Sequence, residues 1–131
     1  MMAAAGSISI RRVYAADGGP DEGTQILVDR LWPRGVRKDK LRADEWLREL
    51  GPSDELRKWF AHDPDRWAEF QRRYRLELRQ ARQQELLRHL AELAEHGPVT
   101  LLYSARDEEH NQAVVLRAVL QEMLEASRHR R

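Results

Sequence analysis

Two short, almost wholly apolar runs constrain the fold most strongly: ILV at residues 26–28 and VTLLY at residues 99–103. A strand with one buried face alternates apolar and polar residues, whereas a nearly continuous apolar run is typical of a strand buried on both faces. Such strands need helices to cover them, so the two runs predict a small sheet with helices on its faces. Residues 8–14 alternate in part and predict a half-buried strand.

The long segment between the two apolar runs has the periodicity of helices. Large apolar residues recur every three or four positions over residues 67–81, which predicts an amphipathic helix. A second apolar stripe covers residues 86–94 and ends before Gly97 and Pro98. The fold class expected from these patterns is α/β, with a small, mostly parallel sheet covered by amphipathic helices.

Start and stop signals divide the rest of the chain. Trp46, Leu47 and Leu50 predict a helix that ends before the glycine and proline that follow. Ser53 is a predicted helix N-cap, and an Asp63–Pro64 pair marks the start of the next helix. The last helix is predicted to begin at Asp107 as its N-cap and to carry its apolar stripe on Ala113, Leu116, Val119, Leu120 and Met123.

A chain of 131 residues fits one domain. We expect residues 1–7 to be disordered, residues 8–126 to form the domain, and residues 127–131 to be a basic tail. About ten residues join the first two strands, which is short for a parallel crossover, so antiparallel pairing of these strands stays open.

Composition excludes several classes of protein. Lys and Arg number 23 against 22 Asp and Glu, a net charge of +1 that argues against a general polyanion binder. Without cysteine there can be no disulfide, zinc–thiolate site or thiol nucleophile. No apolar run approaches the ~20 residues that span a bilayer, and no signal peptide is evident, so we expect a soluble, cytoplasmic protein without a membrane partner. The glycine motifs that bind nucleotides are also missing, and we expect no cofactor.

Three segments together carry a family resemblance: LVDRLWPRG at 27–35, LRKWFAHDPDRW at 56–67 and GPVTLLYSARDEEHNQAVVL at 97–116. Over residues 8–120 the chain resembles the YeaO-like branch of the domain-of-unknown-function 488 (DUF488) family of bacteria and archaea. The resemblance implies a small α/β domain whose first two strands are parallel, and it brings no established activity. Other branches carry a cysteine in the segment that matches residues 103–111, where this chain has none, so their thiol chemistry does not transfer.

The loops after residues 28 and 103 are the predicted site, because ligands of open α/β sheets bind at the carboxyl ends of the strands. Residues 30–42 also hold six basic residues and only one acidic residue. The ligand-binding candidates are Arg30, Trp32, Arg34, Gly35, Ser104, Arg106 and Asn111, and the catalytic candidates are His110 and Asp29. If the two strands are parallel neighbours, Arg30 or Arg34 should lie near Ser104, Arg106 or His110.

Each candidate also has a structural interpretation. Arg30 and Arg34 could present planar forks to a phosphate or carboxylate, and Gly35 would allow close backbone approach. Alternatively, Arg30 pairs with an acidic helix, and Trp32 packs with the following proline as a lid on the core. Asp29 is the expected internal counter-ion of the arginines.

His110 would occupy the third position of the last helix, where the helix dipole favours the neutral imidazole that a general base needs. In the structural alternative it hydrogen-bonds locally and stabilises its loop. A metal site assembled from His62, Asp63, Asp107 and His110 lacks the usual ligand spacing, and we expect none.

Two functions fit these observations. In the first, the protein binds, and in its stronger form acts on, a small anionic ligand that bears a phosphate or carboxylate. In the alternative, it is a nucleic-acid or protein interaction module without catalysis, which would use residues 30–42 and the arginines of the tail.

Overall fold

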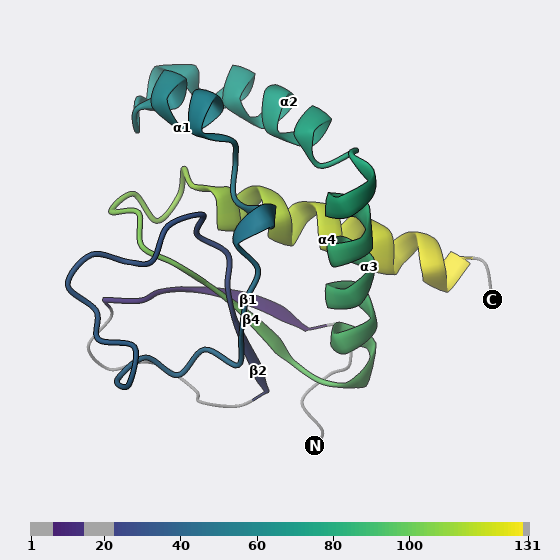
Figure 1. The fold of residues 1–131 in the computed structure, drawn as a ribbon. Coiled ribbons are helices and arrows are strands. Elements are labelled where there is room, and N and C mark those ends of the chain that lie inside the picture. Colours follow the sequence, from purple (N-terminus) through teal and green to yellow (C-terminus); the bar gives the residue numbers. More distant parts are fainter. Residues whose placement is uncertain (1–6, 15–22, 130–131) are drawn as a thin grey trace.

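A computed structural model describes residues 7–14 and 23–129. These residues form an α/β fold with a four-stranded sheet in the order β1-β4-β2-β3 (Figure 1). The strands are β1 (Ile8–Arg12), β2 (Thr24–Leu27), β3 (Glu45–Trp46) and β4 (Val99–Tyr103). All pairings are parallel, so the predicted fold class is confirmed.

Four α-helices accompany the sheet: α1 (Asp54–Phe60), α2 (Trp67–Glu77), α3 (Ala81–His96) and α4 (Gln112–His129). Helices α3 and α4 contact each other and pack on β4, and α4 also contacts β1. Figure 1 shows α1 and α2 as a separate tier beside the loop that joins β4 to α4. This tier therefore stands over one end of the strands.

The central position of β4 explains its apolar sequence. Every residue of β4 is buried, because β1 and β2 flank the strand and side chains cover both faces. Leu101 and Tyr103 belong to the main core, whereas Leu27 and Leu102 are fully buried outside it, as the alternation of a strand requires.

The first two strands do not pair with each other. β4 lies between them and is parallel to both, so the antiparallel alternative is wrong and the parallel arrangement implied by the family resemblance is confirmed. β1 is shorter than the predicted segment and ends at Arg12.

The helix predicted through Trp46 is wrong. Glu45 and Trp46 form the edge strand β3, which pairs with Ile26 and Leu27 of β2. A 3-10 turn at Arg48–Leu50 follows. The hydrogen bonds offered by the edge of β2 outweigh the short apolar spacing that predicted a helix.

Two of the predicted helix starts are confirmed. The Ser53 hydroxyl accepts a hydrogen bond from the Leu56 N–H at 3.1 Å at the start of α1. The Asp63 carboxylate accepts one from the Asp65 N–H at 3.0 Å and caps the 3-10 turn Pro64–Arg66, which leads into α2. The periodic segment predicted to reach residue 81 ends earlier, because α2 stops at Glu77 and α3 begins at Ala81.

The ends of the chain differ from expectation or fall outside the description. α4 continues through His129, so it includes residues 127–129 of the predicted tail. The Ser7 carbonyl accepts a hydrogen bond from Val99, and the rest of the predicted disordered terminus lies outside the described residues. In the described part of the chain, no helix is both long enough and apolar enough to cross a membrane.

Candidate functional site

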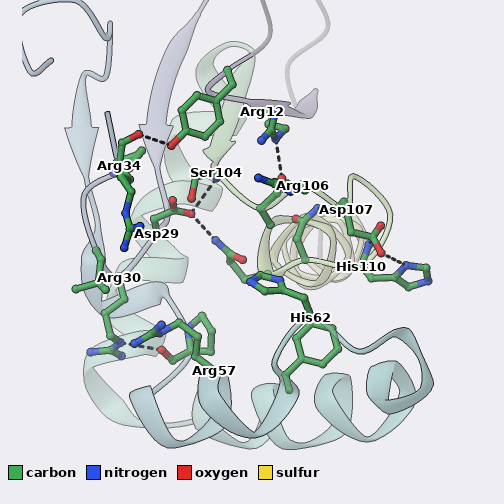
Figure 2. Close-up of a pocket in the computed structure, with 18 of the residues that line it drawn as sticks. Arg12, Asp29, Arg30, Arg34, Arg57, His62, Ser104, Arg106, Asp107 and His110 are labelled. Atoms are coloured by element: carbon green, nitrogen blue, oxygen red, sulfur yellow. Dashed lines mark hydrogen bonds and ion pairs between the residues drawn. The ribbon is translucent and has the colours of Figure 1, made fainter. Parts of the chain in front are cut away.

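A pocket of about 1040 Å³ lies at the carboxyl end of the sheet, between the loops that follow β2 and β4 (Figure 2). Its lining includes every predicted site residue except Gly35, namely Asp29, Arg30, Trp32, Arg34, Ser104, Arg106, His110 and Asn111. Because β2 and β4 are parallel neighbours, their following loops emerge at the same edge. The predicted meeting of the two loops is therefore confirmed.

Asp29 forms the floor of this pocket and is 6% exposed. Its Oδ1 accepts hydrogen bonds from the Ser104 N–H at 3.3 Å and from the Gln112 side-chain amide at 2.6 Å. Burial raises the pKa of Asp29 above its ordinary value, and the hydrogen bonds from Ser104 and Gln112 oppose that rise.

The prediction that Asp29 is the counter-ion of the arginines is wrong. Among the described residues, Asp29 forms no ion pair. Its contacts are instead with the backbone N–H and side chain of Ser104 and with the neutral amide of Gln112. A carboxylate thus lies buried in an arginine-rich pocket without a cation bound directly to it.

Arg30 serves the fold. Its Nε donates to the Pro52 carbonyl at 2.8 Å and its Nη2 to the Gly51 carbonyl at 2.9 Å. These contacts join the loop after β2 to the segment before α1. The structural interpretation of Arg30 is right about its role but wrong about its partner, which is backbone rather than an acidic helix.

Trp32 also has a structural contact network. Its ring N–H donates to the Val36 carbonyl at 2.7 Å, and its ring meets Trp46 edge-on with centroids 5.3 Å apart. Gly35 adopts a φ of 77°, which glycine tolerates without strain, and nothing lies within 4 Å of where a side chain would begin. Gly35 therefore suits the turn, and it is not among the residues that line the pocket.

Arg34 and Arg106 differ from Arg30, because both side chains are exposed at the pocket. Within the described ranges, neither guanidinium makes a hydrogen bond or an ion pair. The main chain of Arg34 is held in place, since its carbonyl accepts a hydrogen bond from the Tyr14 hydroxyl at 2.6 Å. Two uncommitted cations thus reach the pocket from the loops of neighbouring strands.

The pocket lining also includes Arg12, Arg57 and Gln112, which the sequence analysis did not name, and His62, which it weighed only as a metal ligand. Arg12 donates from Nε to the Ala105 carbonyl at 2.9 Å, and Arg57 pairs with Asp54 at 3.3 Å on the surface. His62 has a φ of 56°, an uncommon conformation for a residue with a side chain. The segment at 56–67 was distinctive in sequence, and this was the signal that could have drawn attention to Arg57.

The turn before α4 differs from the predicted helix start. α4 begins at Gln112, and Asn111 caps it by accepting hydrogen bonds from the N–H groups of Ala113 at 2.9 Å and Val114 at 3.3 Å. The predictions that Asp107 is the N-cap and that His110 lies in the first turn of the helix are wrong. The Asn111 amide nitrogen donates to the Asp107 carbonyl at 2.9 Å, so both ends of this side chain are occupied.

His110 and Asp107 form a local pair. The His110 Nδ1 lies 2.8 Å from Asp107 Oδ2, and the imidazole meets Trp67 edge-on at 5.1 Å between centroids. Hydrogen bonds from the Glu109 N–H and from His110 lower the pKa of Asp107. In Figure 2 this pair lies on the opposite side of the pocket from Arg30 and Arg34. The local contact of the structural alternative is therefore present.

The charge balance of the lining is strongly positive. Among the described residues, five arginines line the pocket against two aspartates. Arginine presents several N–H donors in one plane and binds carboxylate or phosphate through paired hydrogen bonds. In the part of the chain that is described, no group of three or more His, Cys, Asp or Glu side chains could hold a metal ion.

Comparison with known proteins supplies the family. Residues 7–131 match DUF488-N3i, described as the inactive DUF488-N3 subclade. The chain belongs to the DUF488-N3i family. This assignment confirms the resemblance predicted from the three sequence segments.

Two relatives of this DUF488-N3i protein illustrate the similarity. It is 46% identical over 110 residues to the "Uncharacterized protein YeaO" of Escherichia coli (strain K12), which covers 84% of this chain and 93% of the relative. It is 40% identical over 113 residues to the "Uncharacterized protein Rv3073c" of Mycobacterium tuberculosis, with 86% of this chain and 92% of the relative covered. No solved structure matches the chain.

Proposed function

We propose that this DUF488-N3i protein binds a small anionic ligand, bearing a phosphate or a carboxylate, in the pocket at the carboxyl end of its sheet. The observation that carries the proposal is that Arg34 and Arg106 line one pocket. Both are exposed at the pocket, and neither has a partner among the described residues. Positive charges that share one pocket without a counter-ion favour a bound anion, since an opposite charge nearby stabilises the charged form.

Two observations favour binding over catalysis. The family is described as inactive, and the chain has no cysteine to act as a nucleophile. The catalytic candidates also belong to separate networks, since His110 contacts Asp107 whereas Asp29 contacts Ser104 and Gln112. Catalytic roles for His110 and Asp29 stay predictions, as does a cytoplasmic location.

The nucleic-acid alternative has weaker support. In the basic stretch, Arg30 is committed to backbone carbonyls, Arg37 pairs with Asp39 at 2.8 Å, and Arg42 lies 3.5 Å from Asp44. Arg128 of the tail lies 3.8 Å from Glu125. Partial neutralisation of this kind weakens the attraction for a phosphate backbone.

Calorimetric titration with inorganic phosphate at fixed ionic strength tests the proposal. Loss of one hydrogen bond to a charged group costs about 1.5–3 kcal/mol, so Arg34→Ala and Arg106→Ala should each weaken binding by roughly tenfold or more. Arg37→Ala is the matched control, because it removes the same charge from the same loop outside the pocket lining. It should leave phosphate binding nearly unchanged.

Equal binding by the three variants would refute the assignment of the ligand to this pocket. Titration with duplex DNA at two salt concentrations addresses the alternative, since an affinity that falls steeply with salt is the mark of phosphate-backbone contacts. Retention of DNA at low salt, together with no binding of inorganic phosphate, would favour the interaction module.

A further inference from the structure

The arginine-rich pocket contains one group that an anion alone does not explain. Asp29 lines the pocket and its residue is only 6% exposed. Burial raises the pKa of its carboxyl group. A negative charge at the floor opposes binding of a purely anionic ligand. Its presence there indicates that part of the ligand interacts with a hydrogen-bond acceptor.

The hydrogen bonds of Asp29 leave acceptor capacity for such an interaction, since the two oxygens of a carboxylate together offer about four acceptor sites. The Ser104 N–H and the Gln112 amide both donate to Oδ1. The Ser104 side chain also contacts the carboxylate, which leaves Asp29 one further acceptor site for a ligand. Figure 2 shows Asp29 beside Ser104, within the same pocket that Arg34 lines.

The surrounding charges restrict the kind of donor that can reach Asp29. An ammonium group on the ligand would be repelled by the five arginines of the lining. A hydroxyl group carries no charge and donates one hydrogen bond, which a carboxylate accepts strongly. The expected partner of Asp29 is therefore a ligand hydroxyl.

The anionic part of the ligand is better matched by a phosphate monoester than by a carboxylate. Arg34 and Arg106 come from the loops after two different strands, and Arg12 and Arg57 come from elsewhere in the chain. A phosphate monoester carries a charge of about −1.5 to −2 at neutral pH and three acceptor oxygens, which can face donors in several directions. A planar carboxylate presents two oxygens and a single charge.

The pocket also has room for more than a phosphate group. Its volume of about 1040 Å³ reaches the upper end of small-molecule sites, which run from roughly 300 to 1,000 Å³. The rings of Phe60, Phe70 and Trp32 contribute apolar lining. A ligand with a phosphate and a hydroxylated ring would meet both the arginines and Asp29.

We infer that the ligand is a hydroxylated phosphate monoester of the sugar-phosphate or nucleotide class, with its phosphate on Arg34 and Arg106 and a hydroxyl donated to Asp29. This inference rests on the proposed anion-binding function and adds the chemistry of the rest of the ligand.

Two matched pairs of compounds test the inference by calorimetric titration of the intact protein. The first pair is ribose 5-phosphate and tetrahydrofurfuryl phosphate, which keeps the ring and phosphate but has no hydroxyl. The second is adenosine 5′-monophosphate and its 2′,3′-dideoxy analogue, which tests the nucleotide source. A hydrogen bond to a charged group should make the hydroxylated member of at least one pair bind about tenfold tighter or more.

Two variants test whether Asp29 causes the tighter binding of the hydroxylated compound. Asp29→Asn should reduce the ratio within the pair to about twofold or less, because a neutral amide replaces the charged acceptor. It should leave inorganic phosphate bound at least as tightly, since a negative charge has been removed from the pocket. Arg34→Ala should weaken both members of a pair equally and keep their ratio.

The outcomes separate this inference from the proposed function. If inorganic phosphate binds but the wild-type protein does not distinguish the members of either pair, the hydroxyl inference is overturned and anion binding stands. If no phosphate compound binds, the proposed function itself fails. The comparison within the wild-type protein needs no variant, so a failure of Asp29→Asn to fold would not remove the test.

Discussion

Arg30 and Arg34 lie in the same loop and line the same pocket, yet replacing each with alanine should impair a different property of the protein. Arg30 is committed to the Pro52 and Gly51 carbonyls at 2.8 and 2.9 Å. Arg34 is exposed and without a partner among the residues described. We therefore expect Arg30→Ala to lower stability and Arg34→Ala to lower ligand binding while leaving stability unchanged.

The magnitude for Arg30 follows from its two hydrogen bonds. Each bond to a charged group contributes about 1.5–3 kcal/mol, and a buried acceptor left unsatisfied costs about 1–3 kcal/mol. Gly51 and Pro52 are buried, whereas Arg30 is only half-buried, so water can replace part of the interaction. We expect a loss of about 2–3 kcal/mol in the free energy of unfolding, or roughly 8–12 °C in Tm for a domain of this size. For Arg34→Ala the change should stay within about 0.5 kcal/mol.

Urea unfolding followed by circular dichroism measures both effects. The midpoint for Arg30→Ala should fall clearly below that of the wild type, with an unchanged slope, while the midpoint for Arg34→Ala should coincide with it. Arg30→Lys is a useful intermediate, because a single ammonium group lacks the planar fork that reaches both carbonyls. Equal midpoints for Arg30→Ala and the wild type would refute the structural role of Arg30, and a comparable loss in Arg34→Ala would refute the division between the two arginines.

Two further predictions address the same region. Gly51→Ala should lower the urea midpoint, because the added Cβ would lie 2.8 Å from the backbone nitrogen of Arg30, and a wild-type midpoint would show that the loop can move aside. Burial raises the folded-state pKa of Asp29 above 3.8, so its stabilising contribution is complete below that pH and is lost as the pH rises through the folded pKa. The free energy of unfolding of Asp29→Asn, measured relative to wild type from pH 3 to pH 7, should therefore rise with pH, and a flat or falling difference would contradict the direction of the shift.

The sequence alone determined the elements whose patterns reflect burial. The apolar runs at 26–28 and 99–103 predicted the strands at the centre of the sheet, because a strand buried on both faces cannot alternate. The caps at Ser53 and Asp63 were also predictable, since a side chain that satisfies the first N–H groups of a helix acts within three residues. The helix caps depend only on neighbouring residues, and burial on both faces of a strand requires a run of apolar residues that is visible in the sequence.

Local patterns failed where a distant segment competed for the same residues. Trp46 fits a helical spacing, but it pairs with Leu27 at the edge of β2 and so belongs to β3. Asp107 was predicted to cap α4, but the cap is Asn111. Both residue types can cap a helix, so the sequence did not distinguish them. Asn111 is buried and supplies the cap, whereas Asp107 accepts from His110 and Glu109 in the preceding turn. Spacing along the chain cannot rank such alternatives.

The pocket shows the same division between sequence and tertiary structure. The rule that ligands bind at the carboxyl ends of parallel strands predicted which two loops would meet, because strand direction alone decides the edge at which a loop emerges. Which arginine is free was decided only by the tertiary structure. Arg30 and Arg34 are equivalent as residue types, but the Gly51 and Pro52 carbonyls are brought to Arg30 by a contact across more than twenty residues of chain. A hydrogen bond needs its acceptor within about 3 Å, and only the folded chain sets that distance.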